Sequence, residues 1–159
     1  MEEIGKYIKG LFLLTFLNAN ATMLSKSWLQ NKKSEQKFEI KKKQEVIKGT
    51  LKWDLETNTW IFEYPDEIWQ LKGKTLKKYK NKKVKEYPAS GFLSIFKVPI
   101  SKWDSSLKGI KERCDENTCA MFALYKNNPI LIEYEPEPFK LKKIESEDSN
   151  RNYYKIEFI

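Results

Sequence analysis

The amino-acid sequence predicts a mainly β domain with helices (α+β class), in which a curved antiparallel sheet forms an unclosed half-barrel beneath a helical or loop lid. Short segments of alternating apolar and polar residues are separated by closely spaced turn residues, as in an antiparallel meander. One apolar stretch, residues 89–111, interrupts that pattern. A sheet of about nine or ten strands in a 159-residue chain is expected to curl, and this length fits one domain.

The first strands are predicted in two neighbouring segments. Residues 37–41 alternate between polar and apolar side chains, which is the period of a half-buried strand. Residues 46–53 are rich in β-forming residues, and Gly49 among them predicts a bulge or a bend. Residues 22–36, which precede them, are polar and are expected to be helical or loose.

Three aromatic residues mark the next strand. Trp60, Phe62 and Tyr64 occupy every second position, so they should share one face of a strand that ends at Pro65. Further strand signals are separated by turn residues and comprise residues 68–71, 76–79, 84–87, 119–125, 130–134, 139–144 and 153–158.

The interrupting stretch is predicted to leave the sheet and to cover one of its faces. Its apolar cluster comprises Phe92, Leu93, Ile95 and Phe96. Pro99 ends this cluster, and Trp103, Leu107 and Ile110 then follow at helix-like spacings. We therefore expect a loop-and-helix excursion across the sheet.

Residues 1–21 are typical of a signal peptide. Lys6 and Lys9 give a positive start, residues 11–17 form a short apolar core, and small residues precede an expected cleavage after Ala21. An N-terminal amphipathic helix is the alternative, with one face formed by Ile4, Tyr7, Ile8 and Leu11. Export to the periplasm is the preferred interpretation, and residues 22–159 would then form a single domain.

Export gives the two cysteines a structural interpretation. Cys114 and Cys119 enclose a polar, turn-like stretch, and in an oxidising compartment a disulfide between them would staple a tight connection. Two free thiols in a cytosolic protein are the alternative. The spacing fits neither a C-x-x-C redox motif nor a zinc ribbon.

Composition argues against several classes of function. The formal net charge is +8, and nearly all the positive charge is lysine, which suits attraction to anionic surfaces better than sequence-specific reading of nucleic acid. The chain contains no histidine, so a catalytic Cys–His pair and a Cys/His zinc site are impossible. We therefore predict a protein that is not an enzyme and that needs no cofactor or metal.

The aromatic residues of the first meander form either an ordinary hydrophobic core or the lining of a groove for an apolar ligand. The candidate lipid-binding residues on the strands are Trp60, Phe62, Tyr64, Leu71, Leu76 and Tyr79. The candidates on the lid are Phe92, Leu93, Ile95 and Phe96. A curled sheet with a lid is a natural container for acyl chains.

Lysines interleaved with an aromatic ring in residues 77–83 allow a different function. They suit a platform on which single-stranded nucleic acid stacks, or a solvated edge that blocks sheet-to-sheet aggregation. The alternative function is thus a basic binding module for nucleic acid or an anionic membrane surface, although we expect no nucleic-acid partner.

Scattered motifs resemble the family of bacterial periplasmic lipoprotein carriers, the LolA-like outer-membrane lipoprotein carriers. The motifs are Gly49-Thr50-Leu51, Trp60-Ile61-Phe62-Glu63-Tyr64-Pro65, Leu71-Lys72-Gly73-Lys74-Thr75-Leu76 with Tyr79, and the later pair Pro138-Phe139-Lys140-Leu141-Lys142-Lys143-Ile144 and Tyr153-Tyr154-Lys155-Ile156. The family usually has a basic residue and a proline before the tryptophan, where this chain has Asp54-Leu55-Glu56-Thr57.

The resemblance implies an unclosed β-barrel covered by helices, whose apolar interior holds the acyl chains of a lipoprotein during transit to the outer membrane. The implied partners are acyl chains and the lipoprotein-sorting proteins of the inner and outer membranes, and the implied state is a monomer. The departure before the tryptophan leaves open a lipid-binding relative with another client.

Overall fold

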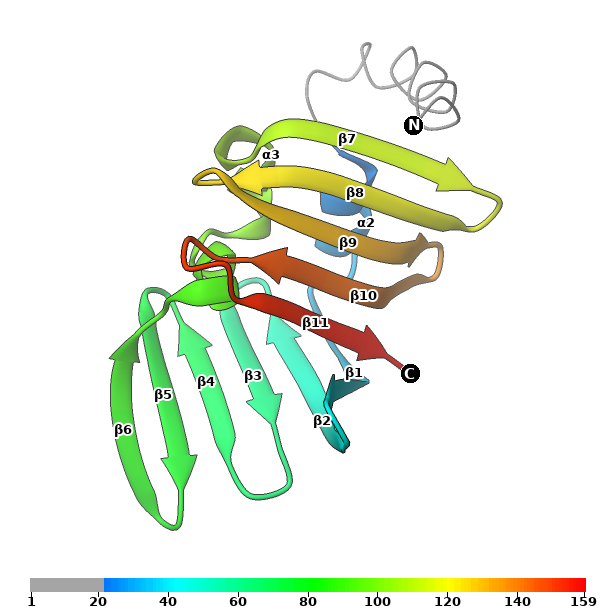
Figure 1. The fold of residues 1–159 in the computed structure, drawn as a ribbon. Helices are drawn as coiled ribbons and strands as arrows, with labels where there is room; N and C mark the ends of the chain where they lie inside the picture. The colour runs from blue at the N-terminus through cyan, green and yellow to red at the C-terminus, as the bar shows by residue number, and fades with distance from the viewer. Residues whose placement is uncertain (1–21) are drawn as a thin grey trace.

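The computed structural model describes residues 22–159, so the predicted signal peptide, residues 1–21, lies outside the described part (Figure 1). The elements are α2 (Met23–Leu29), β1 (Lys33–Lys42), β2 (Glu45–Asp54), β3 (Thr59–Glu63), β4 (Ile68–Lys72), β5 (Thr75–Lys80), β6 (Lys83–Pro88), the 3₁₀ helices η1 (Gly91–Lys97) and η2 (Ile100–Lys102), α3 (Trp103–Ser106), β7 (Lys108–Asp115), β8 (Thr118–Tyr125), β9 (Asn128–Pro136), β10 (Phe139–Glu147) and β11 (Tyr153–Phe158). None of the helices in this part is long and apolar enough to cross a membrane.

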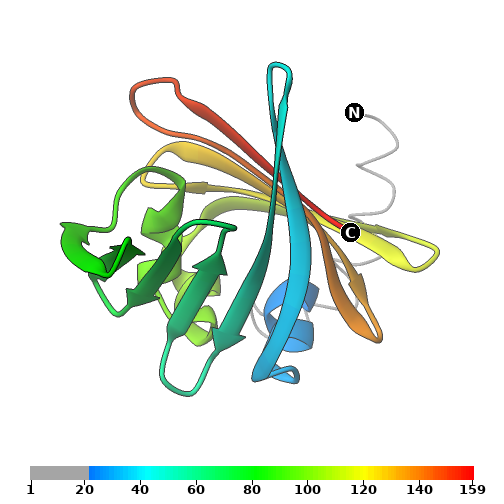
Figure 2. The same ribbon diagram turned by 90° about the horizontal axis from the view of Figure 1, so that it is seen from below.

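All eleven strands belong to one antiparallel sheet, in the order β6-β5-β4-β3-β2-β1-β11-β10-β9-β8-β7. Two meanders, β1–β6 and β7–β11, join where β1 pairs with β11, with Phe38 opposite Phe158. Strands β6 and β7 are the two edges, so the sheet bends without closing (Figure 2). The predicted mainly β class and unclosed antiparallel sheet are confirmed.

Tight turns set the register of the hairpins. Asn81 and Lys82 both have positive φ between β5 and β6, and Lys126 and Asn127 do so between β8 and β9. Two successive residues of this kind make the two-residue turn whose twist matches that of the flanking strands. Asparagine tolerates this conformation better than most residues, which explains its place in both turns.

Of the bulge or bend predicted at Gly49, the structure shows no bulge. The pairing of β1 with β2 runs without a register shift, and Gly49 lies opposite Phe38. A Cβ at Gly49 would lie 2.5 Å from the Phe38 ring and 2.7 Å from the carbonyl oxygen of Glu63. The glycine therefore makes room for an aromatic ring that packs across the strand.

The connection from β6 to β7 has to cross the sheet because it joins the two edges. Its helices η1, η2 and α3, residues 91–106, are here called the covering segment, and they lie with α2 on the inner face of the bend (Figure 2). Strand β7 was not predicted, because Leu107 and Ile110 are spaced as in a helix. Instead α3 ends at Ser106, and Ile110 belongs to a strand.

The outer face of the sheet is charged. Partly exposed cross-strand ion pairs include Lys52 with Glu63, at 2.8 Å, and Lys143 with Glu133, at 3.2 Å. Ion pairs at the surface contribute little to stability, so they favour solubility and register more. The face opposite the core is therefore the solvent side of the sheet.

A disulfide joins Cys114 and Cys119 across the β7–β8 hairpin, as predicted. Closing so short a loop restricts the unfolded chain and contributes about 2 kcal/mol. The bond is compatible with an exported protein, because disulfides persist in oxidising compartments.

Candidate functional site

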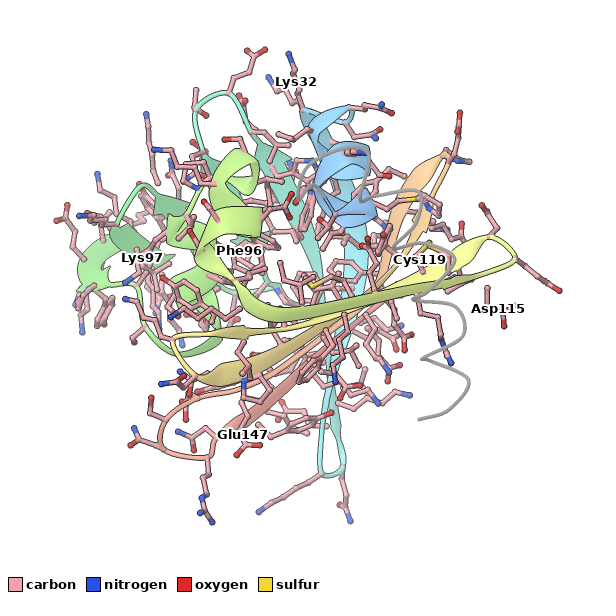
Figure 3. All side chains as sticks on the ribbon, turned by 90° about the horizontal axis from the view of Figure 1, so that it is seen from above. Lys32, Phe96, Lys97, Asp115, Cys119 and Glu147 are labelled. Carbon is pink, nitrogen blue, oxygen red and sulfur yellow. A yellow bond between two sulfur atoms is a disulfide. The ribbon has the colours of Figure 1, made fainter. Side chains whose placement is uncertain are left out.

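An aromatic cluster fills the space between the sheet, α2 and the covering segment (Figure 3). Trp28 of α2 lies at its centre and is fully buried. Its ring centroid lies 5.3 Å from Trp60, 5.5 Å from Trp103, 5.8 Å from Trp53 and 5.4 Å from Phe139. The three tryptophan contacts are edge-to-face, a favourable geometry for aromatic rings. The chain's own side chains therefore occupy the inner face.

Most of the predicted lipid-binding residues meet in this cluster. At most 5% of the surface is exposed for Trp60, Phe62, Leu71, Leu76, Leu93, Ile95 and Phe96. The ring of Phe96 lies 4.6 Å from that of Trp60 and 6.2 Å from that of Phe62. The candidate residues on the strands, here called the strand group, are thus in direct contact with those on the covering segment.

Tyr64 directly follows β3 and is half-buried against the same cluster, with its ring centroid 5.7 Å from that of Phe38, and burial raises the pKa of its hydroxyl. Tyr79 lies on the outer face, where its hydroxyl donates to Gln70 Oε1 at 3.4 Å. Positions 76 and 79 are three apart in one strand and so face opposite sides, which means that Tyr79 is not brought together with Leu76. Phe92 belongs to η1, and its side chain lies outside the described part.

Asn58, in the β2–β3 turn, ties the end of η1 to the sheet. Its side-chain amide donates to the carbonyl oxygens of Phe96, at 3.5 Å, and Lys97, at 3.3 Å. Its Oδ1 accepts from Nε1 of Trp60 at 3.2 Å. These are long bonds at or near the surface, so η1 depends mainly on apolar packing to stay in place.

Asp104 of α3 holds the start of α2. Its carboxylate accepts hydrogen bonds from the backbone N–H of Thr22 at 3.0 Å, the hydroxyl of Thr22 at 2.9 Å and the hydroxyl of Ser25 at 3.0 Å. The Thr22 hydroxyl also accepts from the N–H of Ser25, which is an N-cap contact. This network fastens α2 to the covering segment.

Glu112 of β7 holds the same helix end from the other side. It accepts from the N–H groups of Met23 at 2.7 Å and Leu24 at 3.0 Å, and from the hydroxyl of Tyr134 at 2.8 Å. Burial raises the pKa of Glu112 above its usual value, with a further contribution from nearby Asp104, and the three donors only partly offset this. The carboxylate anchors α2 at a desolvation cost.

Glu112 should make stability depend on pH. Its raised pKa means that, from about 4.5 up to the folded-state value, the folded protein binds more protons than the unfolded chain. The contribution of Glu112 to stability is therefore full below this window and is lost as pH rises through the folded-state pKa. We expect the unfolding free energy of wild type minus that of Glu112→Gln, measured by urea denaturation, to fall as pH rises. A difference that increased with pH would contradict this assignment.

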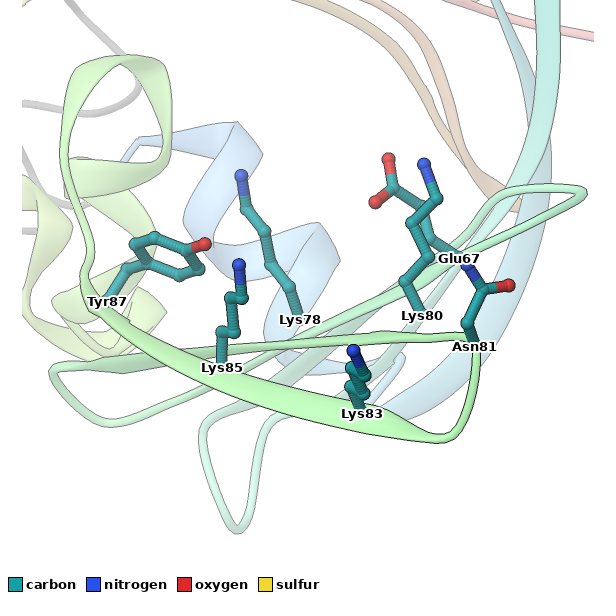
Figure 4. Close-up of a pocket in the computed structure, with 7 residues that line it drawn as sticks. All are labelled: Glu67, Lys78, Lys80, Asn81, Lys83, Lys85 and Tyr87. Carbon is teal, nitrogen blue, oxygen red and sulfur yellow. The ribbon is translucent and has the colours of Figure 1, made fainter.

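A second feature of the inner face is a hollow of about 260 Å³ at its β5–β6 end, here called the basic hollow (Figure 4). It is lined by Glu67, Lys78, Lys80, Asn81, Lys83, Lys85 and Tyr87. Four lysines face one glutamate, so the lining has a strong positive charge. The lysine side chains stand on the same side of the hairpin in Figure 4.

Sequence reasoning missed the centre of the cluster. Leu24 and Trp28 are four residues apart, the spacing of two side chains on one helix face, so a helical signal was present in residues expected to be helical or loose. No local signal placed Trp103 or Phe139 beside Trp28, because these contacts join segments far apart in the chain. Asp104 and Glu112 carried no motif that marked them as anchors.

No protein-family model matches this chain, and a search of curated proteins finds no match to it. A function for this protein must therefore be inferred from the geometry of the described residues.

Proposed function

We propose that the protein is a carrier that shelters the acyl chains of a lipid or lipoprotein beneath a lid during transfer to the outer membrane. The observation that supports this most directly is the burial of one continuous apolar face of a bent, unclosed sheet beneath short helices. A face made of Trp60, Phe62, Leu71 and their neighbours would suit hydrocarbon when those helices move aside. The curved sheet would then act as a half-barrel.

The moving part in this proposal is η1. It carries Leu93, Ile95 and Phe96, which contact the strand group, and Asn58 ties its end to the sheet through two long hydrogen bonds. The start of α2, by contrast, is clamped by the carboxylates of Asp104 and Glu112. An entering chain would displace η1 before it displaced α2.

The energies allow such an exchange. Each buried methylene contributes about 0.8 kcal/mol, so one acyl chain supplies roughly 10 kcal/mol before ordering costs. The apolar side chains of η1 must leave the sheet, which costs part of that gain. The net affinity would be moderate, which is what a protein that must release its client requires.

Export is part of the proposal. Cleavage after Ala21 would make Thr22 the first residue, and its backbone nitrogen lies 3.0 Å from Oδ2 of Asp104. The new α-ammonium group would then face a carboxylate already held by Ser25. A free terminus at this position would fit the folded domain without rearrangement of α2. The sorting proteins of the two membranes are the implied partners, and a monomer is the implied state.

Mass spectrometry of the protein purified from its native cell envelope tests export and lipid binding together. We expect the denatured chain to have the mass of residues 22–159, with one disulfide, and the native protein to release a co-purifying lipid or acylated peptide. An intact chain that begins at Met1 would contradict export. Protein that carries no acylated molecule, and that binds no dansyl-labelled undecanoic acid when this is added, would contradict the carrier function.

A further inference from the structure

We infer that the basic hollow binds the anionic, phosphate-bearing headgroup of a lipid. This deepens the proposed function by naming the chemistry of the ligand, and it rests on that function for the position of the acyl chain. The hollow and the aromatic cluster lie on the same face of the same sheet, so one amphiphilic molecule can contact both.

The register of the β5–β6 hairpin places like charges opposite each other. Lys78 pairs with Lys85, and Lys80 pairs with Lys83, all on the inner face. Like charges directly across an antiparallel pair are destabilising. An anion between the two strands would turn this repulsion into attraction.

The outer face of the same two strands shows the opposite arrangement. Lys77 lies directly opposite Glu86, with Nζ and Oε1 3.8 Å apart. Among the lysines that line the hollow, Lys80 pairs with exposed Asp66 at 3.9 Å, whereas Lys83 and Lys85 have no ion pair with any described residue. On the two strands themselves, the lysines without an ion pair thus lie on the concave side, an arrangement that solubility alone does not require.

Aromatic rings position one of these ammonium groups. Nζ of Lys78 lies 4.1 Å above the ring of Trp69 and 5.0 Å from that of Tyr87. Such cation–π contacts hold a lysine in one place without neutralising it. Lys78 therefore remains available to an anion at a fixed point between the apolar interior and the open end.

The position and size of the hollow favour a lipid headgroup over nucleic acid. Leu76, which is 5% exposed, precedes Lys78 by two residues on the same face and pairs with buried Leu71. The inner face thus changes from apolar to cationic along one strand, as an amphiphile requires. A space of about 260 Å³ suits a single headgroup, whereas single-stranded nucleic acid is bound along a track of several nucleotides.

Calorimetric titration of the whole protein with water-soluble short-chain lipids tests the inference. The probes are dihexanoyl phosphatidylglycerol, which is anionic, and dihexanoyl phosphatidylcholine, which is zwitterionic and has the same chains. At low salt we expect roughly tenfold tighter binding of the anionic lipid, with a smaller preference near 0.15 M ionic strength. Inorganic phosphate and a single-stranded oligonucleotide, tested in parallel, should bind more weakly.

Two matched variants locate the effect. Lys85→Glu should abolish the preference for the anionic lipid without lowering the melting temperature, because the new glutamate would face Lys78. Lys72→Glu makes the same change in net charge on the outer face of β4, where it should leave the preference intact. If Lys85 served only to stabilise the fold, its replacement would lower the melting temperature together with binding.

Several outcomes would overturn the inference. Equal binding of the two lipids by wild type, an intact preference in Lys85→Glu, or an equal loss in Lys72→Glu would each do so while leaving the carrier function standing. Phosphate or oligonucleotide binding as tight as that of the anionic lipid would also do so. Failure of both lipids to bind would instead remove the carrier function itself.

Discussion

Replacement of Phe96 by alanine is expected to tighten acyl-chain binding at least tenfold while it destabilises the protein by about 3–5 kcal/mol. Phe96 is fully buried against Trp60, Phe62 and Trp103, so in the empty protein its ring occupies space that a ligand needs. A binding-competent state that is rarely populated weakens the apparent affinity, and a looser η1 removes part of this penalty. The vacated space is also an apolar cavity that hydrocarbon can enter.

The affinity is measured by fluorescence titration with dansyl-labelled undecanoic acid, and the stability by urea denaturation. Trp60→Ala should instead weaken binding, because Trp60 belongs to the sheet surface that would hold the chain. Phe122→Ala is the matched control, since Phe122 lies on β8 and is 38% exposed. If Phe96→Ala weakened binding as Trp60→Ala does, the ligand would not take the place of η1.

Replacement of Trp28 by alanine is expected to be the most destabilising single change, at about 3–5 kcal/mol or more. Four aromatic rings surround the indole, and its loss would detach α2 from both meanders. Because domains are typically stable by about 5–15 kcal/mol, the variant would lie close to unfolding at room temperature. The midpoint of urea denaturation, followed by circular dichroism, measures the effect.

Trp28→Phe should cost much less than Trp28→Ala. The indole Nε1 is buried and has no hydrogen-bond partner among the described residues, so phenylalanine loses volume but no bond. Trp69→Ala is the matched control, since Trp69 is only half-buried at the rim of the cluster. A cost for Trp28→Ala no larger than that for Trp69→Ala would mean that α2 does not dock on the sheet in solution.

Local periodicity was sufficient to predict most of the strands. Trp60 and Phe62 are aromatic residues two positions apart, and both lie on the buried face as that spacing requires. The same rule, applied strictly, separates Leu76 from Tyr79, and the structure places them on opposite faces. The sequence already indicated that Leu76 and Tyr79 face opposite sides of the strand. Placing both among the residues that line one groove was therefore wrong.

Other features had misleading or ambiguous local signals. Ile110 follows Leu107 at a helical spacing, yet it belongs to β7, in the stretch between Lys108 and Lys111 where the pairing with β8 shifts register. Gly49 was consistent with a bulge or a bend, and it makes no bulge but leaves space for the ring of Phe38. In both cases a partner distant in sequence, or on a neighbouring strand, determined the outcome.

The sequence alone was enough to predict the mainly β class, the shared face of Trp60 and Phe62 in β3, and a disulfide between Cys114 and Cys119 if the protein is exported. These properties depend on residues within a few positions of one another, where backbone geometry permits few alternatives. Only the tertiary structure decided that Trp28 and Phe96 fill the inner face, and that the hairpin register sets Lys78 against Lys85. Those facts depend on which distant segments pack together, and packing is a property of the whole chain rather than of any one segment.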